Sequence, residues 1–314
     1  MLVYPPVNIL LSTFNGMSFL GQQLDSLQAQ DYPNIFIYIR DDGSTDGTSD
    51  FLQNYQQQFP NVKLSVGENL GYTRSFLELA LNTKTGGEEF YAFCDQDDVW
   101  SPQKISSAMK LLQQSPKPAM TLYFCRANFV DSQLQLLKQS SIPRYLDFGN
   151  ALAECTPLGC TMVFGSEIYN LLIQGDPNEM FAHDWWVYLV ATAFGHVVYD
   201  PQSHIQFREH AFNTSIAHKM GTSLSMRLKF RIKDLWQRLF KDQPIVDFLI
   251  QAEKFSMIYE NLPSEKRLTI EKLFQLRMSN SELHRLRYVF NSKIHFNDPL
   301  EDLVLQLMIL LGHH

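Results

Sequence analysis

The sequence predicts an α/β fold with a mostly parallel sheet and flanking helices, followed by a helical C-terminal region. Over the first hundred residues, short apolar runs alternate with helical patterns, as they do in β-α-β units with crossover helices. A second observation is that the sequence pattern changes after about residue 219, where long segments with apolar residues at helical spacing and with basic residues begin. We therefore predict two parts, residues 1–218 and 219–314.

Val7 to Leu11 is a short apolar run with the character of a strand buried on both faces of a sheet, and three further strand-like runs follow it. The segments between them carry apolar residues at helical spacing, for example Phe19, Leu20, Leu24 and Leu27. Later strand-like runs indicate that the same domain continues to about residue 215. The first four strands are expected at 7–11, 35–39, 62–66 and 90–94, and the later ones at 120–125, 160–164 and 197–199.

Composition excludes several classes of protein. The chain has 314 residues, of which 45% are hydrophobic and 19% charged, which suits a packed globular core. Its formal net charge of −7 argues against a nucleic-acid partner, whose binding surface would be basic. The N-terminus lacks a basic region before its apolar run, and no apolar stretch reaches the length of a spanning helix, so we expect a cytoplasmic protein. The four cysteines lack the paired spacing of a zinc site and are expected to be reduced thiols.

Each predicted strand is followed by a polar cluster. The carboxyl ends of parallel strands meet at one sheet edge, where ligands bind in open α/β folds. The fourth strand runs directly into Asp95, Gln96, Asp97 and Asp98. Because crowded carboxylates at a buried strand end repel one another, a divalent cation such as Mg²⁺ or Mn²⁺ would relieve the conflict. A solvated acidic turn or a helix cap explains the same residues without a cation.

Two other clusters have both a ligand interpretation and a local one. Asp42 could accept a hydrogen bond from the N3–H of a pyrimidine base, whereas its neighbours Ser44 to Asp46 could simply cap the next helix. Gly71 could admit close approach of the backbone to a ligand, and the guanidinium of Arg74 could reach a phosphate. Taken alone, the Asn69-Leu70-Gly71 pattern is more often a simple loop followed by a helix cap.

Taken together, the motifs resemble those of the inverting glycosyltransferases of family 2, which have the GT-A fold. The acidic motif with GCTM and HDWW is similar to bacterial rhamnosyltransferases of cell-wall and capsular polysaccharide synthesis. The QxxRW motif and membrane spans of the polymer-forming synthases are missing, which favours the addition of one sugar. The motifs, which extend from residue 7 to about 215, are LLSTFNG, RDDGSTDGT, ENLGYTRSF, FCDQDDVWSPQKI, PLGCTMVF, HDWW and FREHAFN.

The resemblance implies roles for individual residues. Asp184 would be the general base, although an ordinary core helix also explains HDWW. Asp97 would be the principal metal ligand beside Asp95, while Asp98 would brace the turn. Arg208 and His210 would lie on a loop near the diphosphate. The donor nucleotide would contact Ser12, Thr13, Phe14, Asn15, Asp42, Gly71, Arg74, Asp95 and Gln96. The acceptor pocket would include Trp100, Gly159, Cys160, Thr161, Trp185 and Trp186.

The implied activity is transfer of one sugar from a nucleotide-sugar donor to a saccharide or lipid-linked acceptor. The resemblance favours rhamnose from a dTDP donor, with a UDP-hexose donor as the alternative. A sugar nucleotidyltransferase would be expected to carry an early glycine-rich, basic phosphate loop, which LLSTFNG is not. A non-catalytic nucleotide-sugar-binding module is disfavoured because Asp95, Asp97 and Asp184 are all present.

The region after residue 219 has two features of interest. Residues 224–241 form a basic amphipathic pattern, which predicts either peripheral membrane contact or packing on the catalytic domain. Residues 262–311 carry further apolar stripes, which indicate a helical bundle or a homodimer contact.

Overall fold

The computed structural model describes residues 4–83, 87, 89–210, 243–278 and 281–311. It divides the chain into two compact units. The first contains residues 1–142 and 157–208, and the second contains residues 143–156 and 209–314. The predicted boundary at 218/219 and the basic segment 224–241 lie outside the described residues.

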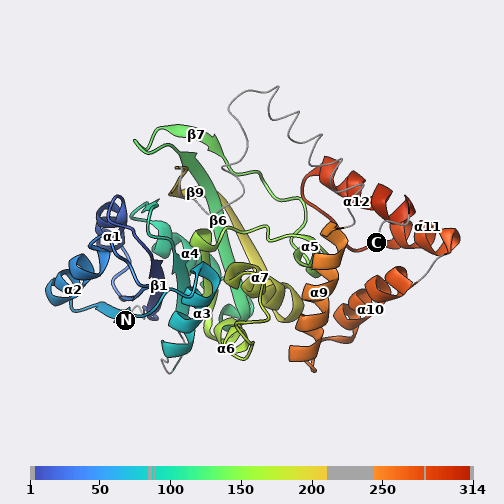
Figure 1. Ribbon diagram of the computed structural model, residues 1–314, viewed down its shortest axis with the longest axis horizontal. Coiled ribbons are helices and arrows are strands. Elements are labelled where there is room, and N and C mark those ends of the chain that lie inside the picture. The colour runs from blue at the N-terminus through green and yellow to red at the C-terminus, as the bar shows by residue number, and fades with distance from the viewer. Residues whose placement is uncertain (1–3, 84–86, 88, 211–242, 279–280, 312–314) are drawn as a thin grey trace. The chain divides into compact units, whose positions relative to one another are not determined.

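One nine-stranded sheet forms the centre of the first unit (Figure 1). Its strand order is β3-β2-β1-β4-β8-β6-β9-β5, and β7 pairs with β6. The pairs among β1 to β4 are parallel, as the alternation of strands and helices predicts. The strands are β1 (Val7–Thr13), β2 (Ile35–Asp41), β3 (Val62–Val66), β4 (Phe90–Cys94), β5 (Val99–Trp100), β6 (Thr121–Val130), β7 (Leu136–Gln139), β8 (Met162–Gly165) and β9 (His196–Arg208).

The second half of the sheet is mixed. Strand β8 is antiparallel to both β4 and β6, β5 is antiparallel to β9, and β6 with β9 form a long parallel pair. The β6–β9 pairing is interrupted by a register shift at Arg126, where the partner changes from Asp200 to Ser203 and then Ile205. Pairing among β1 to β4 is therefore entirely parallel, whereas the rest of the sheet combines the parallel β6–β9 pair with antiparallel pairs of β8, β5 and β7.

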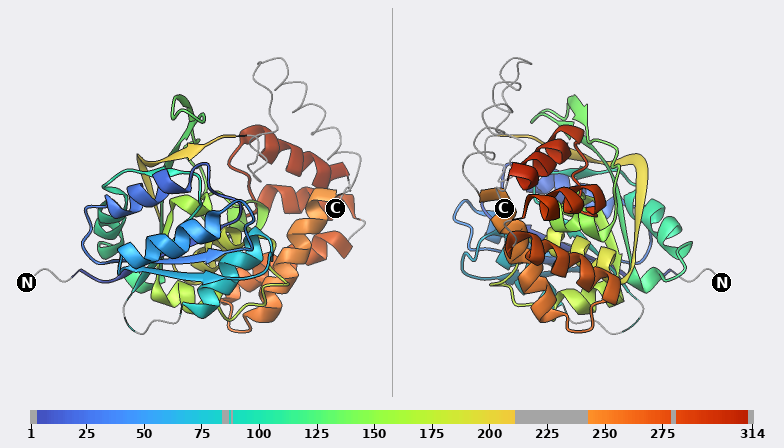
Figure 2. Two further views of the ribbon diagram at one scale, coloured as in Figure 1. Left: turned by 60° about the vertical axis from the view of Figure 1, so that its left-hand side comes forward. Right: turned by 90° about the vertical axis from the view of Figure 1, so that its right-hand side faces the viewer.

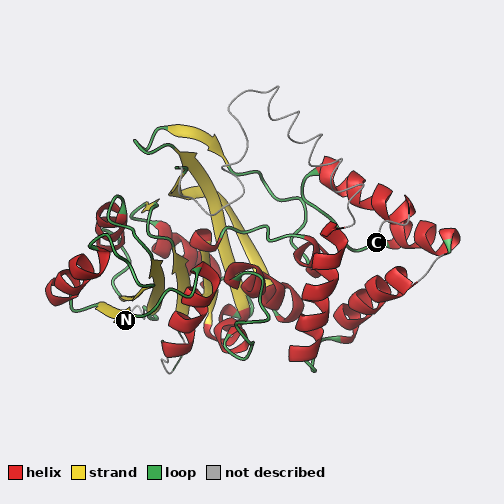
Figure 3. Cartoon of the chain, in the orientation of Figure 1, coloured by secondary structure: helices red, strands yellow, loops and turns green. Residues whose placement is uncertain are grey.

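Helices flank the sheet on both sides (Figure 3). Alternate residues of β1, namely Val7, Ile9 and Leu11, belong to one core cluster with apolar residues of α1, α2 and α4. Because neighbouring strand residues point to opposite faces, Phe93 of β4 points the other way and packs on Phe76 of α3. The helices of this unit are α1 (Leu20–Gln28), α2 (Thr48–Gln58), α3 (Tyr72–Asn82), α4 (Lys104–Gln113), α6 (Ser166–Leu172) and α7 (His183–Phe194).

The second unit is helical, as expected for the C-terminal region (Figure 2). It also includes residues 143–156, which the sequence did not separate from the first unit. Asn297 holds this segment, because its side-chain oxygen accepts from Tyr145 N at 2.8 Å and its Nδ2 donates to Thr156 Oγ1 at 2.8 Å. The helices are α5 (Phe148–Ala153), α9 (Gln243–Ile258), α10 (Ser264–Met278), α11 (Glu282–Asn291) and α12 (Pro299–Leu311).

Among the described residues, no helix is long and apolar enough to cross a membrane. All four cysteines are free thiols, which confirms the expectation from their spacing. Cys94, Cys125 and Cys160 are buried, and Cys155 is partly exposed.

Candidate active site

The loops that follow β1 and β4 are joined by a reciprocal pair of hydrogen bonds. Phe14 N donates to Gln96 Oε1 at 2.9 Å, and Gln96 Nε2 donates to Phe14 O at 3.0 Å. The Gln96 amide is thus engaged with the backbone of the β1 loop. Its contact fixes the acidic loop against the first strand at the carboxyl edge of the sheet.

The β1 loop is also joined to the loop after β2. Asn15, in the left-handed backbone region at φ 49°, accepts from Thr45 N at 2.8 Å, and its own N donates to Ser44 Oγ at 2.8 Å. Thr13 Oγ1 donates to Asp41 Oδ1 at 2.9 Å in the interior. The predicted nucleotide-binding residues on β1 and β2 therefore form one connected rim.

Asp42 is almost fully buried, and its carboxylate is used within the protein. It pairs with Arg40 and accepts from Leu70 N at 2.9 Å and from Gly71 N at 3.0 Å. Arg40 in turn donates to Glu68 O at 3.0 Å. This buried pair holds the loop at 68–71, so the geometry gives Asp42 a structural task in addition to the base contact expected from the resemblance.

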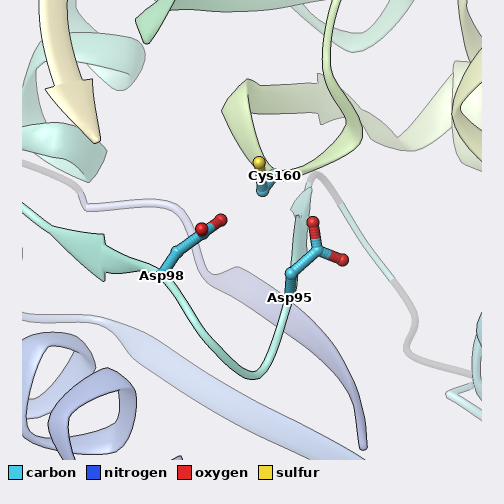
Figure 4. Close-up of side chains that lie close together, drawn as sticks. All are labelled: Asp95, Asp98 and Cys160. Carbon is cyan, nitrogen blue, oxygen red and sulfur yellow. The ribbon is translucent and has the colours of Figure 1, made fainter. Parts of the chain in front are cut away.

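Two acidic residues and a cysteine lie close together where β4 ends. Asp95, Asp98 and Cys160 each place one ligand atom within 4.8 Å of the others (Figure 4). Asp98 is fully buried, and its Oδ2 has no hydrogen-bond partner in the described structure. Burial, followed by the negative charges of Asp97 and Asp184, raises the pKa of the Asp95 carboxyl to about 7. Burial and its acidic neighbours raise the pKa of Asp98 well above its ordinary value.

This donor set fits a hard divalent cation. Carboxylate oxygens suit Mg²⁺ and Mn²⁺, and a cation would satisfy the unpaired Oδ2 of Asp98. Burial raises the pKa of the Cys160 thiol well above its ordinary value, so the thiol stays protonated at neutral pH. The carboxylates of Asp95 and Asp98 are therefore the candidate ligands for a hard cation, and Cys160 lies beside them.

Asp184 lies at the start of α7, close enough to Asp95 for its charge to raise the Asp95 pKa. Its Oδ1 accepts from Trp185 N at 2.8 Å. Gly159 lies directly behind it, since a Cβ added to this glycine would be 3.2 Å from Asp184 Cβ. The HDWW and GCTM motifs, far apart from DQDD in the sequence, thus meet the acidic loop at one sheet edge.

His183 anchors the start of α7 in the core. Its ring stacks on Phe76 with centroids 4.1 Å apart and meets Phe93 edge-on at 4.6 Å. Burial lowers the pKa of His183, so the imidazole is neutral at physiological pH. This aromatic packing positions the adjacent Asp184 and gives His183 a structural role.

Comparison with known proteins decides the family. The family model described as glycosyl transferase family 2 matches residues 8–164, half of the chain. The chain belongs to glycosyl transferase family 2.

Relatives of this family 2 transferase include a dTDP-rhamnosyl transferase of Shigella flexneri. It is 25% identical over 248 residues, which cover 73% of this chain and 81% of the relative. Among solved structures, TarS of S. aureus in complex with UDP-GlcNAc has a TM-score of 0.52 at 15% identity, covering 98% of this chain and 91% of TarS. A mannosyltransferase of Pyrobaculum calidifontis in complex with GDP-Man and Mn2+ has a TM-score of 0.50 at 17% identity, with coverages of 99% and 86%. These similarities show the GT-A fold.

Two predicted acceptor residues of the transferase are corrected by the structure. Trp186 is 0% exposed and Trp100 is 2% exposed, so both belong to the core and neither can form an open wall. Trp186 lies among the buried residues of α7, and Trp100 lies in β5 as part of the core cluster that also contains apolar residues of α1 and α4. Trp185 and Gly159 are partly exposed and stay candidates for acceptor contact. Cys160 and Thr161 are each 1% exposed and are therefore buried like the two tryptophans.

The residues predicted to contact the phosphates, Arg208, Arg74 and His210, lie in three different environments. Arg208 is buried, and its guanidinium donates to Asp97 O at 2.8 Å and to Ser132 O at 2.7 Å, while its backbone N donates to Asp98 Oδ1 at 3.0 Å. It therefore braces the acidic loop from behind. Arg74 is exposed on α3 and donates to Asn178. His210 belongs to the second unit, and its expected role stays a prediction.

Sequence reasoning missed Lys104. This side chain is fully buried, its Nζ lies 3.2 Å from the centre of the Trp100 ring, and it has no hydrogen-bond partner in the described structure. Burial lowers its pKa, while the nearby Cys125, Cys94 and Cys160 thiols and Asp98 act in the opposite direction. A cation beneath the acidic loop is a counter-charge to the carboxylates. In the sequence, Lys104 is only a lysine six residues after Asp98, and nothing distinguishes it from a lysine on the surface.

Proposed function

We propose that this family 2 glycosyltransferase moves rhamnose from dTDP-rhamnose to a saccharide or lipid-linked saccharide acceptor, with inversion at the anomeric carbon, in bacterial polysaccharide synthesis. The observation that carries the proposal is the approach of Asp184 to the Asp95 cluster, because it sets a further carboxylate beside a candidate cation site at the donor edge. The similarity to a dTDP-rhamnosyl transferase supports the choice of donor.

In this proposal Asp184 is the general base. An acceptor hydroxyl has a pKa far above neutrality, so a positioned carboxylate must take its proton as it attacks the anomeric carbon. Asp184 lies at the N-terminus of α7, where the helix dipole stabilises its negative charge before transfer. One displacement assisted by one base inverts the sugar and needs no covalent intermediate.

The acidic loop would hold the diphosphate end of the donor. Asp95 and Asp98 would be ligands to Mg²⁺ or Mn²⁺, with Asp97 beside them, and Arg208 keeps the loop in place from behind. A divalent cation bound there would neutralise charge that develops on the leaving nucleoside diphosphate. The rim formed by Thr13, Asn15 and the loop at 68–71 would receive the nucleotide. We place the reaction in the cytoplasm, where activated nucleotide sugars would be available.

The test is a donor panel assayed for release of nucleoside diphosphate with Mn²⁺, Mg²⁺ or EDTA. We expect turnover with dTDP-rhamnose that exceeds turnover with UDP-glucose, UDP-galactose, UDP-GlcNAc and GDP-mannose, and loss of all turnover in EDTA. Faster turnover of a UDP-hexose would overturn the choice of rhamnose and leave the transferase intact. Failure of every donor to bind or react in the presence of metal would sink the whole proposal.

A further inference from the structure

Two aromatic side chains flank the proposed base on the outer side of the segment that starts α7. Phe181 is 39% exposed, and Asp184 and Trp185 are partly exposed. The side chains of this segment that are buried recur at intervals of three and are Met180, His183 and Trp186. Because these three take the inner side, Asp184 and the two aromatic rings share the side that faces solvent.

The two outer rings lie beside each other. The centroids of the Phe181 and Trp185 rings are 6.5 Å apart, and the ring planes are inclined by 33°. An apolar residue just before a helix often packs against the first turn, which by itself explains why a phenylalanine stands here. That packing buries a ring, whereas Phe181 keeps 39% of its surface exposed beside a second ring that is also accessible. Adjoining aromatic rings with a carboxylate next to them are typical of a ligand contact.

The loop before α7 holds Phe181 in this position. The neighbouring Met180 is buried, and its Cε lies only 2.1 Å from where a Cβ on Gly175 would be, so the glycine makes room for the methionine. Arg74 of α3 donates to Asn178 of the same loop, which ties the loop to that helix. A ring that is already fixed loses little conformational freedom when a ligand packs on it.

The chemistry around the base favours a neutral sugar ring as the occupant. Residues 174–185 contain Asp176, Glu179 and Asp184 and no lysine or arginine, so this side of the site disfavours a phosphate-bearing acceptor. A lipid chain needs a continuous apolar surface, which the Asp184 carboxylate interrupts. One face of a pyranose carries C–H bonds whose slight positive charge suits the negative face of an aromatic ring, and its hydroxyls stay available to a carboxylate. An acyclic polyol has no such face.

We propose that Phe181 and Trp185 form a stacking surface for a pyranose ring of a glycan acceptor, with one hydroxyl of that glycan turned toward Asp184. This inference rests on the proposed function, because the role of Asp184 as base brings the acceptor to this side of α7. It adds Phe181 to the acceptor contacts and narrows the acceptor to a glycan with a cyclic sugar beside the reacting hydroxyl. Phe181 binds and orients this sugar and takes no part in the chemical step.

The surface is tested directly by saturation-transfer NMR of the full chain, with and without dTDP and Mg²⁺. The probes are the methyl pyranosides of glucose, galactose and rhamnose, and the acyclic ribitol and glycerol phosphate. Irradiation of the aromatic protons should saturate the C–H protons of one pyranose face in wild type, and Phe181→Ala should lose most of this signal. Phe36→Ala is the matched control, because Phe36 is 38% exposed near the start of β2 and should keep the wild-type signal.

Initial rates with the pyranoside that gives the strongest signal separate binding from chemistry. Phe181→Ala should raise the KM for this pyranoside by about 3–10-fold, the loss expected for one aromatic contact, and leave kcat at saturating acceptor unchanged. Phe181→Tyr keeps a ring and should restore the wild-type KM. Hydrolysis of the donor without acceptor should be equal in all these proteins, and circular dichroism checks that each is folded.

Three results would overturn the stacking surface: no signal from any pyranoside in wild type, saturation of ribitol or glycerol phosphate in place of the pyranosides, or an unchanged KM in Phe181→Ala. The outcome for the proposed function is read separately. A pyranoside signal that depends on Phe181, in a protein that releases nucleoside diphosphate from no donor, would leave the stacking surface standing and refute the proposed transfer.

Discussion

At the scale of single residues, Asp184 is the side chain whose removal tests the mechanism most directly. Asp184→Asn keeps the shape of the side chain and removes the base, so the turnover number should fall by about 10²–10⁴-fold. Donor affinity should stay the same or rise slightly, because the Asp184 charge raises the pKa of Asp95 and its loss favours the ionised Asp95. Initial rates and calorimetric binding of dTDP with Mn²⁺ separate the two effects. A large loss of donor affinity would assign Asp184 to the donor pocket.

The sequence motif and the structure favour different residues as the main metal ligand, Asp97 in the first case and Asp98 in the second. The resemblance makes Asp97 the principal ligand, whereas the buried group contains Asp95 and Asp98, with Asp98 Oδ2 unpaired. We expect Asp98→Asn to weaken Mn²⁺ binding by at least about 10–100-fold, the range typical of residues that only orient metal ligands. Electron paramagnetic resonance of Mn²⁺ with each of the two Asn variants decides between them. If only Asp97→Asn releases Mn²⁺, the motif assignment is right and Asp98 braces the loop through Arg208 N.

Lys104 should matter for the reaction more than for the fold. Lys104→Met keeps most of the buried apolar stem and removes the charge beneath the carboxylates. We expect metal-dependent turnover to fall by about 10–100-fold, as for other residues that support a metal site from behind. The melting temperature should change little, because loss of the counter-charge to Asp98 opposes the gain from removing a buried ammonium that has no hydrogen-bond partner. A variant with normal turnover would show that Lys104 only fills space against Trp100.

At the scale of elements, the approach of residues 159–161 to α7 sets the position of the base. In Gly159→Ala the new Cβ would lie 3.2 Å from Asp184 Cβ and 3.3 Å from both Asp184 Oδ2 and His183 Nε2. The carboxylate must then move by a few tenths of an ångström, which should reduce the turnover number far more than the melting temperature. Gly21→Ala in α1 is the control, since its Cβ would meet nothing within 4 Å. Equal turnover in the two variants would mean that the base tolerates displacement.

The sequence predicts correctly those strands that can be recognised from the apolar residues within the strand itself. Strands β1 to β4 are short segments rich in apolar residues, and their residue ranges agree closely with the prediction. Strand β9 is much longer than predicted, because Asp200, Gln202 and Ser203 interrupt its apolar pattern while it pairs with β6. In the same way, the convergence of DQDD, GCTM and HDWW followed from motif order, but the burial of Asp98, Lys104 and Trp186 depends on tertiary packing. No local pattern reports that packing.

At the scale of the whole molecule, the two compact units should be distinguishable in unfolding. Residues 143–156 interrupt the first unit in sequence yet belong to the second, where Asn150 Nδ2 donates to His295 O at 3.0 Å. Chains with more than one unit commonly depart from two-state unfolding, so we expect two calorimetric transitions. The proposed donor site lies entirely in residues of the first unit, from Ser12 to Arg208.

Ligand and mutation should therefore act on different transitions. The nucleoside diphosphate dTDP with Mn²⁺ should raise the transition of the first unit by mass action, by about 2.7 kcal/mol at a ligand concentration 100 times the Kd. Gly149→Ala should lower the other transition, because its Cβ would lie 1.6 Å from Lys293 O within the second unit. Differential scanning calorimetry of wild type and variant, each with and without ligand, measures all four cases. A single transition that responds to both changes would mean that the units unfold as one, and the binding energy of the donor would then stabilise the helical unit as well.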